Sequence, residues 1–426
     1  MPDLSVLDHV VLGYSPIIDR QRAVVATRLT LFPARPDAAP DVAALQQALL
    51  QVWPAPEGAG ELQLTLRPLQ PKPGAAPAPA GVTTPVSLNI AGEALLGAVM
   101  HAPPLPHLMI EVPAFMATEP AQAQALQALH AAGAVLLIKG RPLAPVAPEV
   151  LACFSHAVVE ATEERRSTAL PGAGVRQVST VQAGVRTAAE AEAARQRGAV
   201  AVLGWPFDDP LPAAAARSKV ATDIQVVMEL IQGVDREAPV SQLEGVLKRD
   251  PTLAFRLLRY LNSPAFGLSA EVTSFGHAIM MLGYGRLKRW LALLLASSSK
   301  GVNARPLMFA AVRRGLLMEE LGRAQSDAEL RGEMFICGVF SLLDKLLQQP
   351  FADLLKSVPV PERVRQTLLA DEPAGGPFGP YLELVRAIER ESLFDIREST
   401  ERLLLSPGEI NRALLAALRQ AQQLDG

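Results

Sequence analysis

The most polar interruption of the C-terminal half lies in the stretch LNSPAFGLSAEVTSFGHAIMMLG (261–283), between two apolar segments. Asn262 and Ser263 are followed by Pro264, which ends a helix because it lacks an amide hydrogen and clashes with the preceding turn. Ser263 has no GxSxG context and no histidine cluster near it in sequence, so the polar pair is interpreted as satisfying backbone groups at the helix end. The sequence therefore predicts a structural bend formed by Asn262, Ser263, Pro264, Phe266 and Gly267, and no catalytic residue there.

Histidine and cysteine, which serve most often as metal ligands and nucleophiles, are scarce and scattered. None of the six histidines follows position 277, and His277 has the context of a packing residue, without a second histidine or an acidic cluster beside it. Cys153 and Cys337 form neither a CxxC pair nor a disulfide framework, which fits a reducing compartment. No GxxxxGK[ST] phosphate loop occurs. These patterns predict no cofactor and no histidine-based metal site.

The N-terminal half alternates short β-rich runs with helical runs. Repeated βα units favour a parallel sheet, and about eight strands in about 205 residues suit a closed (β/α) TIM-type barrel better than an open sheet. The stretch 68–85 is rich in Pro, Ala and Gly and is typical of an extended loop. Strands are predicted at 10–15, 23–32, 61–66, 85–90, 107–113, 134–139, 156–161, 175–181 and 199–205, and helices at 41–51, 92–101, 120–132 and 187–197.

The hydrophobic period becomes helical from about residue 220, after a joint predicted at 208–219. Asp250 and Pro251 form a favourable helix start, and Gly283 a favourable helix end. The fold class predicted for the whole chain is therefore an α/β barrel followed by an all-α domain. Helices are predicted at 223–234, 240–250, 251–261, 275–282, 285–298, 305–322, 328–348, 361–370, 378–391 and 407–422.

Composition and charge argue for a cytoplasmic protein without a nucleic-acid partner. The formal net charge of -3 gives no overall attraction to nucleic acid or to anionic membranes. The longest apolar run of interest, WLALLLA (290–296), is far too short to span a bilayer, and the N-terminus lacks the basic residues of a signal peptide. The basic residues of the helical half are interpreted as a solvated face: Lys248, Arg249, Arg256, Arg259, Arg286, Lys288, Arg289, Arg313 and Arg314.

The segment DPTLAFRLLRYLNSPAFGLSAEVTSFGHAIMMLGYGRLKRWLALLL (250–295) resembles the HDOD domain, a helical relative of the HD phosphohydrolases. The resemblance extends from about residue 215 to 400 and implies a bacterial signalling role without HD-type catalysis. At the place that resembles the His-Asp doublet of the HD enzymes, this chain has Leu343 and Asp344, and no histidine follows. The resemblance therefore implies no HD-type metal site.

The N-terminal half is similar to the EAL family, which hydrolyses cyclic di-GMP. The segment YSPIIDRQRAVVATRLTLF (14–32) resembles the opening strands of that family, and LGWPFDDP (203–210) resembles its closing strand and turn. An EAL-like domain followed by an HDOD domain is a known arrangement in bacterial signalling. This resemblance also implies a (β/α) barrel.

The metal-ligand positions of the EAL family map unevenly onto this chain. Asn89 and Glu111 match two of them, whereas the signature glutamate falls on Arg28 and an Asp-Asp pair falls on Lys139 and Gly140. The later lysine of the family falls on Val158, with Glu160 the only acid nearby. Because cations repel Mg²⁺ and Mn²⁺, the resemblance implies a degenerate site without metal. Asn89 and Glu111 are interpreted as bridges between strand ends, with Lys139 a candidate partner for Glu111. The alternative is that Arg28 and Lys139 form an anion-binding pocket.

These observations predict a catalytically inactive signalling protein that acts through contacts with other signalling proteins. The predicted domains are an EAL-like barrel at 1–210, an HDOD domain at 211–400 and a helical extension at 401–426. Homo-oligomerisation is left open, and no cyclic di-GMP binding is expected. A non-catalytic cyclic di-GMP receptor is the first alternative, and an active cyclic di-GMP phosphodiesterase is the least favoured one.

Overall fold

A computed structural model places the chain in two compact units. The first comprises Met1–Asp209 together with Arg386–Arg412, and the second comprises Pro210–Val385 together with Ala413–Gly426. The structure describes residues 5–35, 40–53, 85–105, 108–166, 178–211, 222–247, 249, 275–297, 304–324, 327–358, 360–372 and 374–425. The predicted strand at 61–66, most of the predicted loop and joint, and the bend residues Asn262, Ser263, Pro264, Phe266 and Gly267 lie outside these ranges.

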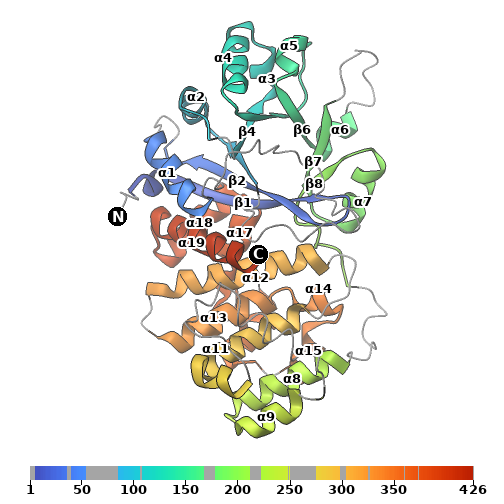
Figure 1. The fold of residues 1–426 in the computed structure, drawn as a ribbon, viewed down its shortest axis with the longest axis vertical. Coiled ribbons are helices and arrows are strands. Elements are labelled where there is room, and N and C mark those ends of the chain that lie inside the picture. The colour runs from blue at the N-terminus through green and yellow to red at the C-terminus, as the bar shows by residue number, and fades with distance from the viewer. Residues whose placement is uncertain are drawn as a thin grey trace. The chain divides into compact units, whose positions relative to one another are not determined.

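The first unit is built on an eight-stranded closed barrel (Figure 1), which confirms the barrel expected from the alternating pattern and fits a TIM-like fold. Its strands are β1 (Val10–Asp19), β2 (Val24–Pro33), β3 (Val86–Ile90), β4 (Leu108–Pro113), β5 (Val135–Lys139), β6 (Phe154–Glu160), β7 (Ser179–Val185) and β8 (Ala201–Gly204).

The expectation of an all-parallel sheet fails at β1. This strand runs antiparallel to both of its neighbours, β2 and β8, whereas β2 to β8 pair with one another in parallel. Only residues 20–23 connect β1 to β2. A parallel crossover needs a connection of about a dozen residues or more, so a link this short can only form a hairpin.

Seven helices in the described part of the first unit lie between its strands. They are α1 (Val42–Val52), α2 (Glu93–His101), α3 (Ala114–Thr118), α4 (Pro120–Ala131), α5 (Pro148–Leu151), α6 (Ala161–Arg166) and α7 (Ala188–Gln196). Four of them, α1, α2, α4 and α7, are predicted by the periodicity. Local sequence fixes some of their starts. Asp41 accepts hydrogen bonds from the first turn of α1, and Thr187 and Glu190 form a reciprocal capping box at α7.

The barrel interior has an apolar layer covered by a polar one. Side chains two residues apart on a strand lie on the same face of the sheet. Moving two residues along a strand therefore leads from the apolar layer to the polar layer. Met109 is thus followed by Glu111 on β4, and Leu137 by Lys139 on β5. The apolar layer consists of Ile17, Ala26, Met109, Leu137, Val158, Val181, Ala183, Ala201 and Leu203. The polar layer above it includes Ser15, Arg28, Glu111, Lys139 and Glu160.

C-terminal residues complete the barrel unit, which differs from the predicted domain division. The end of α17 (Gly379–Glu389), all of α18 (Leu393–Leu403) and the start of α19 (Pro407–Asp425) belong to it, beside β1 and β2 (Figure 1). The Asn411 side chain accepts a hydrogen bond from the Leu12 amide (3.1 Å) and donates to the carbonyls of Leu7 and Val10 (2.7 Å each). The helix α18 was not among the helices predicted from sequence.

The second unit is helical, as expected, and contains α8 (Thr222–Asp235), α9 (Val240–Leu247), α11 (Phe275–Ser297), α12 (Ala304–Leu321), α13 (Ala328–Phe340), α14 (Leu343–Leu347), α15 (Phe351–Ser357) and α16 (Glu362–Leu368). Gly283 interrupts α11 with a positive φ of 72°, at the position where the sequence predicts one helix to end. His277 lies in the first part of this helix.

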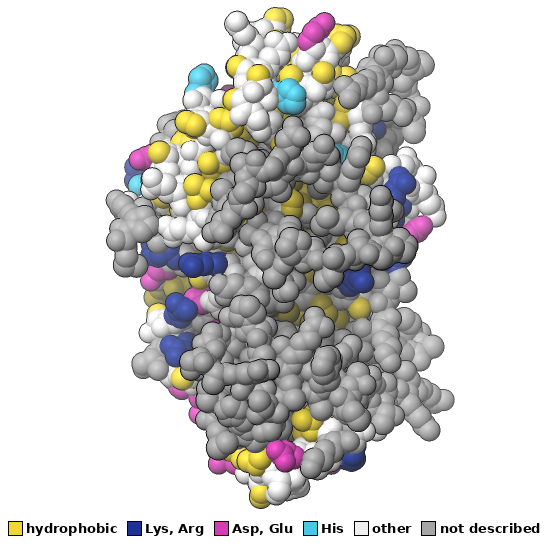
Figure 2. Space-filling model, viewed as in Figure 1, with side chains coloured by type: hydrophobic (Ala, Val, Ile, Leu, Met, Phe, Trp, Pro, Cys, Tyr) yellow, Lys and Arg dark blue, Asp and Glu magenta, His cyan; other side chains and the backbone are white. Residues whose placement is uncertain are grey.

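Two basic residues expected on a solvated face are buried. Arg313 and Arg314 are only 2% and 7% exposed, because α12 is covered on most of its circumference. The Arg313 guanidinium lies over the Phe309 ring, and Arg314 donates a hydrogen bond to Ser341 Oγ (3.0 Å). These arginines therefore belong to the helical core. Over the described surface visible in Figure 2, acidic and basic side chains are interspersed with apolar ones.

Candidate functional site at the barrel mouth

A buried ion pair occupies the polar layer of the barrel. Arg28 of β2 donates from Nη2 to Glu111 Oε2 of β4 at 2.7 Å, and the two residues are 4% and 1% exposed. The other oxygen of Glu111 accepts a hydrogen bond from Ser87 Oγ of β3 (2.9 Å). Both oxygens of the only carboxylate on β4 are therefore already engaged by donors of the barrel wall.

A third charged group reaches this pair from the C-terminal segment. Glu391, in the turn between α17 and α18, accepts from Ser15 Oγ at Oε1 (2.9 Å) and from Arg28 Nη1 at Oε2 (3.3 Å). Its side chain is 14% exposed. The guanidinium of Arg28 therefore lies between two carboxylates, one from the barrel wall and one from a segment more than 360 residues away in sequence.

The backbone holds Glu391 in an unusual conformation. Its φ is +54°, a left-handed value for which glycine is strongly favoured. The amide of Glu391 bonds to the Ile388 carbonyl and that of Ser392 to the Ala387 carbonyl, the pattern of a Schellman motif at the end of α17. The left-handed conformation costs a glutamate about 1 kcal/mol relative to glycine. The backbone strain at Glu391 therefore accompanies the placement of its carboxylate.

Neighbouring residues on β1 and after β8 fit this turn closely. A Cβ on Gly13 would lie 3.1 Å from both Glu391 Cα and the Ile388 carbonyl oxygen, so any larger residue would require a small shift of the turn away from β1. Trp205 Nε1 donates to the Glu389 carbonyl (2.7 Å), and its ring packs edge-on against Tyr14 at a centroid distance of 5.5 Å. The turn is thus held by contacts with β1 and with the segment that follows β8.

Lys139 belongs to a second chain of hydrogen bonds at the mouth. Its Nζ donates to Asn89 Oδ1 (2.7 Å), and Asn89 Nδ2 donates to Thr30 Oγ1 (3.0 Å). The sequence-based candidate pairing of Lys139 with Glu111 is therefore replaced by Lys139 with Asn89, and Glu111 pairs with Arg28. Asn89 does bridge strand ends, since it links β3 to its neighbour β2 and, across β4, to β5.

Glu160, at the end of β6, stands outside these hydrogen-bond chains but adds negative charge to them. Its side chain packs over Gly184, where an added Cβ would collide with Glu160 Oε2. The φ of Gly184 is +70°, so the backbone conformation favours glycine there, whereas the end of the Glu160 side chain could move away from an added Cβ. The charge of Glu160 acts on Arg28 and Lys139 through space.

The buried charges shift one another's pKa. Burial alone would lower the pKa of Arg28, but the carboxylates of Glu111 and Glu391 raise it above its ordinary value, so Arg28 stays protonated. Burial, with the positive charge of Arg28, lowers the pKa of Lys139. Burial also raises the pKa of the Glu391 carboxyl, and Arg28 and Ser15 oppose part of that rise.

This donor set does not fit a hard divalent cation. Mg²⁺ and Mn²⁺ take several oxygen ligands, whereas the centre of this site is a guanidinium and the oxygens of Glu111 accept hydrogen bonds from Arg28 and Ser87. Over the described residues, no group of three or more His, Cys, Asp or Glu side chains is arranged to hold a metal ion. No described helix is long and apolar enough to cross a membrane.

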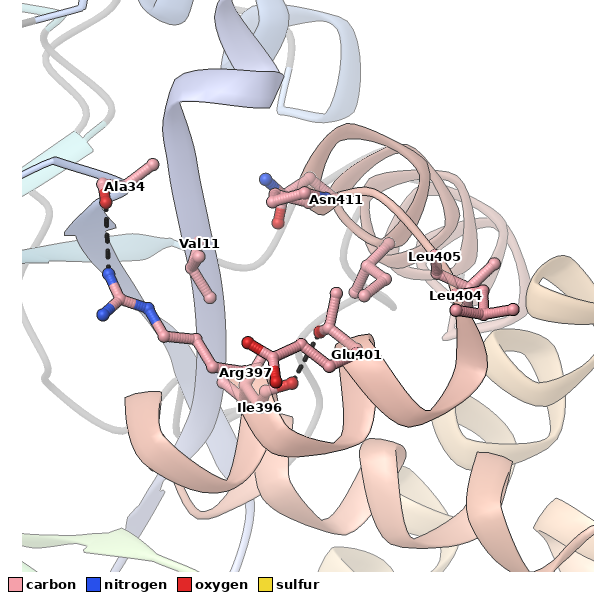
Figure 3. A pocket seen from close by; sticks show the side chains of 11 residues that line it. Val11, Ala34, Ile396, Arg397, Glu401, Leu404, Leu405 and Asn411 are labelled. Carbon is pink, nitrogen blue, oxygen red and sulfur yellow. Dashed lines mark hydrogen bonds between the residues drawn. The ribbon is translucent and has the colours of Figure 1, made fainter.

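A pocket of about 580 Å³ lies where α18 and the start of α19 meet the ends of β1 and β2 (Figure 3). Arg397 Nη2 donates to the Ala34 carbonyl (3.1 Å) across it. Most of the wall is aliphatic, and the Asn411 side-chain amide already forms hydrogen bonds with backbone groups around β1. The pocket therefore offers few free polar groups for recognising a ligand.

Sequence reasoning found Arg28, Asn89, Glu111, Lys139 and Glu160 but missed Ser15 and Glu391. The start of α18, directly after Glu391, could have been predicted from sequence. Ser392 caps α18 by accepting a hydrogen bond from the Asp395 amide, and a serine three residues before an acid is a common helix-start signal. That signal predicts the helix, although nothing in it predicts the carboxylate's partner.

Comparison with protein families identifies the domain that most of the helical unit forms. Residues 220–354 match the family model of the HDOD domain, so this segment is an HDOD domain, as its sequence predicts. The EAL resemblance of the barrel stays a prediction.

Two curated proteins share sequence with the chain. The uncharacterized protein YuxH of Bacillus subtilis (strain 168) is 29% identical over 235 residues, or 54% of this chain and 56% of YuxH. The cyclic di-GMP phosphodiesterase CdgJ of Vibrio cholerae is 24% identical over 242 residues, or 57% of this chain and 55% of CdgJ. The chain thus spans a little over half the length of each relative.

Two solved structures align with about half of this chain at low sequence identity. A putative phosphohydrolase from Shewanella amazonensis SB2B aligns with 47% of this chain and 93% of its own at 16% identity and a TM-score of 0.36. The PaMucR phosphodiesterase in complex with c-di-GMP aligns with 48% and 93% at 16% identity and a TM-score of 0.28. TM-scores of this size do not establish a shared fold.

Proposed function

We propose that this protein is a catalytically inactive signalling protein, derived from a cyclic di-GMP phosphodiesterase, that acts by binding other signalling proteins. The HDOD domain and the cyclic di-GMP phosphodiesterase among its relatives support a signalling role. The proposal of inactivity has its own basis in the barrel, and the proposal of protein partners rests on the HDOD resemblance.

One observation carries the proposed inactivity. Arg28 lies buried between Glu111 and Glu391, at the place where an EAL-like enzyme would hold its metal ions. A cation bound here would have to displace a protonated guanidinium from two carboxylates, and it would then meet Lys139 as well. In a two-metal hydrolysis the metal ions activate the water and neutralise the leaving oxygen, and this arrangement has no place for them.

A nucleotide assay tests inactivity directly. The full chain is incubated with cyclic di-GMP and Mg²⁺ or Mn²⁺, beside an established cyclic di-GMP phosphodiesterase as the assay control. We expect no hydrolysis above the background without protein. Turnover that depends on added metal and disappears in Glu111→Ala would refute the proposal and favour an active enzyme with displaced ligands.

Calorimetry separates the proposed adaptor from a non-catalytic receptor. Titration of cyclic di-GMP into the full chain without metal should give no binding heat at high micromolar concentration. A measurable heat that is lost in Lys139→Ala would instead support a receptor, with the mouth cations as the anion-binding residues.

Partner capture tests the mode of action. The full chain is used as bait in lysate of the native bacterium, and the HDOD segment is used alone beside it. We expect a specific partner protein to be retained by the full chain in a nucleotide-independent manner. Retention that requires added cyclic di-GMP would point to the receptor instead.

A further inference from the structure

The carboxyl group of Glu391 occupies a small, well-defined place at the barrel mouth. One oxygen accepts from Ser15 Oγ and the other from Arg28 Nη1, so both are received by donors of the barrel wall. Ser15 and Arg28 are 3% and 4% exposed. In addition, Arg28 Nε is buried without a hydrogen-bond acceptor among the described residues. The wall therefore offers more donors than Glu391 uses.

The surrounding charges accommodate one negative group at this place and not two. Two cations, Arg28 and Lys139, interact with three carboxylates, those of Glu111, Glu160 and Glu391. Without Glu391 the positive and negative charges would be equal in number. A monoanion that replaced Glu391 would restore the present balance, whereas a dianion would add a further uncompensated charge inside the barrel.

Covalent attachment explains why Glu391 would hold this place against free ligands. The Schellman turn fixes its backbone, and Gly13, Trp205 and Asn411 hold the adjoining segment against the barrel. A group tethered in this way acts at an effective concentration of about millimolar or more, so a weak free ligand competes poorly.

We propose that the barrel mouth is a binding site for a small carboxylate, formed by Ser15 and Arg28, and that Glu391 is its built-in occupant. The segment 386–412 thereby keeps the site closed to monoanionic ligands with a carboxylate group. The proposal does not rest on the absence of catalysis, because its test measures stability and not turnover.

Chemical rescue tests the site. Glu391→Gly removes the side chain and suits the positive φ of the position, so the variant keeps the turn and empties the carboxyl place. Propionate supplies the carbons and the carboxylate that the substitution removes. We expect propionate, at up to about 100 mM, to raise the melting temperature of the variant by about 2–4 °C over equal sodium chloride. The wild-type protein should show no such rise.

Two controls separate specific binding from a salt effect. Propionamide, a neutral molecule of the same shape, should not stabilise Glu391→Gly, and propionate should not stabilise Glu391→Gln, whose side chain fills the place. The combination Glu391→Gly with Ser15→Ala should respond less than Glu391→Gly alone.

The proposal is wrong if folded Glu391→Gly melts at the same temperature with and without propionate, or if wild type and variant gain equally. Where the glycine variant does not fold, Glu391→Ala is used in its place with acetate, which supplies the atoms that this substitution removes. If neither variant folds alone, folding restored by the matching carboxylate supports the site, and failure to fold in its presence counts against it.

Discussion

At the scale of single residues, the mouth of the barrel is a compact example of charges that stabilise one another only as a set. Arg28 is almost completely buried, and its pKa rises because Glu111 and Glu391 are beside it. Glu111 in turn depends on Arg28 and Ser87 for its hydrogen bonds. Removing one member leaves a buried charge without its partner, which strongly lowers the free energy of unfolding. Replacing a whole buried ion pair with apolar side chains of similar volume has a much smaller effect.

Replacing Arg28 tests that dependence. Arg28→Met should lower the free energy of unfolding of the barrel unit by about 3–5 kcal/mol, because the carboxylates of Glu111 and Glu391 lose their buried partner. Urea denaturation measures the change. The double variant Arg28→Met with Glu111→Gln should recover part of the loss, and a double variant no more stable than the single one would mean that the Glu111 charge is not the cause.

The raised pKa of Glu391 predicts a pH dependence with a defined sign. Because the folded state holds the proton more tightly than the unfolded state, this group stabilises the fold below its ordinary pKa, and that contribution is lost as pH rises through the raised value. Wild type should therefore lose stability relative to Glu391→Gln as pH increases upward from about 4.5.

Urea denaturation of wild type and Glu391→Gln across this pH range measures the difference in their free energies of unfolding. Ionisable groups that the substitution leaves unperturbed contribute equally to both proteins, so their titration cancels in this difference. Arg28 stays protonated throughout, and the response of Lys139, which faces the same site, is checked with Lys139→Met. A wild-type protein that gained stability over the variant with rising pH would contradict the direction of the shift.

At the scale of elements, glycine permits the close approach of two helices, and their contact is suited to a matched test. In the HDOD part, α12 and α13 meet at Gly315 and Gly338. A Cβ on Gly338 would lie 2.6 Å from the Arg314 carbonyl oxygen and 2.7 Å from the Gly315 amide nitrogen. Backbone cannot yield as the end of a flexible side chain can, so the two helices would have to separate.

Gly338→Ala should therefore lower the free energy of unfolding by about 1–3 kcal/mol, as expected for overpacking. Gly332, on the same helix, has nothing within 4 Å of an added Cβ, so Gly332→Ala should raise it by about 0.5–1 kcal/mol through helix propensity. Thermal and urea denaturation of the two variants give the comparison. Equal effects would show that the helices are not in close contact at Gly338.

A second element-scale test concerns how α19 is attached to the barrel. Asn411 satisfies one amide and two carbonyls around β1 and is 1% exposed. Asn411→Ala should cost about 2–4 kcal/mol, because those buried backbone groups lose their partners. Arg419→Ala, an exposed position of the same helix, should change stability by less than about 0.5 kcal/mol. A comparable loss in both variants would remove the special role of Asn411.

At the scale of the whole molecule, the barrel unit is discontinuous in sequence. Its two parts are Met1–Asp209 and Arg386–Arg412, and the second part supplies both Glu391 and Asn411. A fragment of residues 1–209 should therefore bind a hydrophobic dye and melt below the corresponding transition of the full chain, because buried residues of β1 lose their cover.

Joining residues 386–412 to that fragment through a flexible Gly/Ser linker should restore a cooperative transition and reduce dye binding. Circular dichroism and dye fluorescence of the two proteins provide the measurement. An isolated 1–209 fragment that melts as cooperatively as the fusion would show that the C-terminal segment is dispensable for the barrel.

The sequence by itself determined the elements and most of the residues at the mouth. Short β-rich runs located β1 to β8, helical periodicity located most of the helices, and the EAL resemblance drew attention to Arg28 and Lys139 among the carboxylates. These features are local, since they depend on residues within one strand or one helix. The short link after β1 would also have revealed the antiparallel hairpin.

Only the tertiary structure decided which charges meet. Arg28 could have faced Glu111, Lys139 could have taken its place, and Glu391 lies 363 residues away from Arg28 in the chain. No sequence period records such a distance, because the pairing depends on how β1, the barrel wall and the turn after α17 come together in space. The same holds for Arg313 and Arg314, whose charges suggest solvent but whose helix is covered by its neighbours.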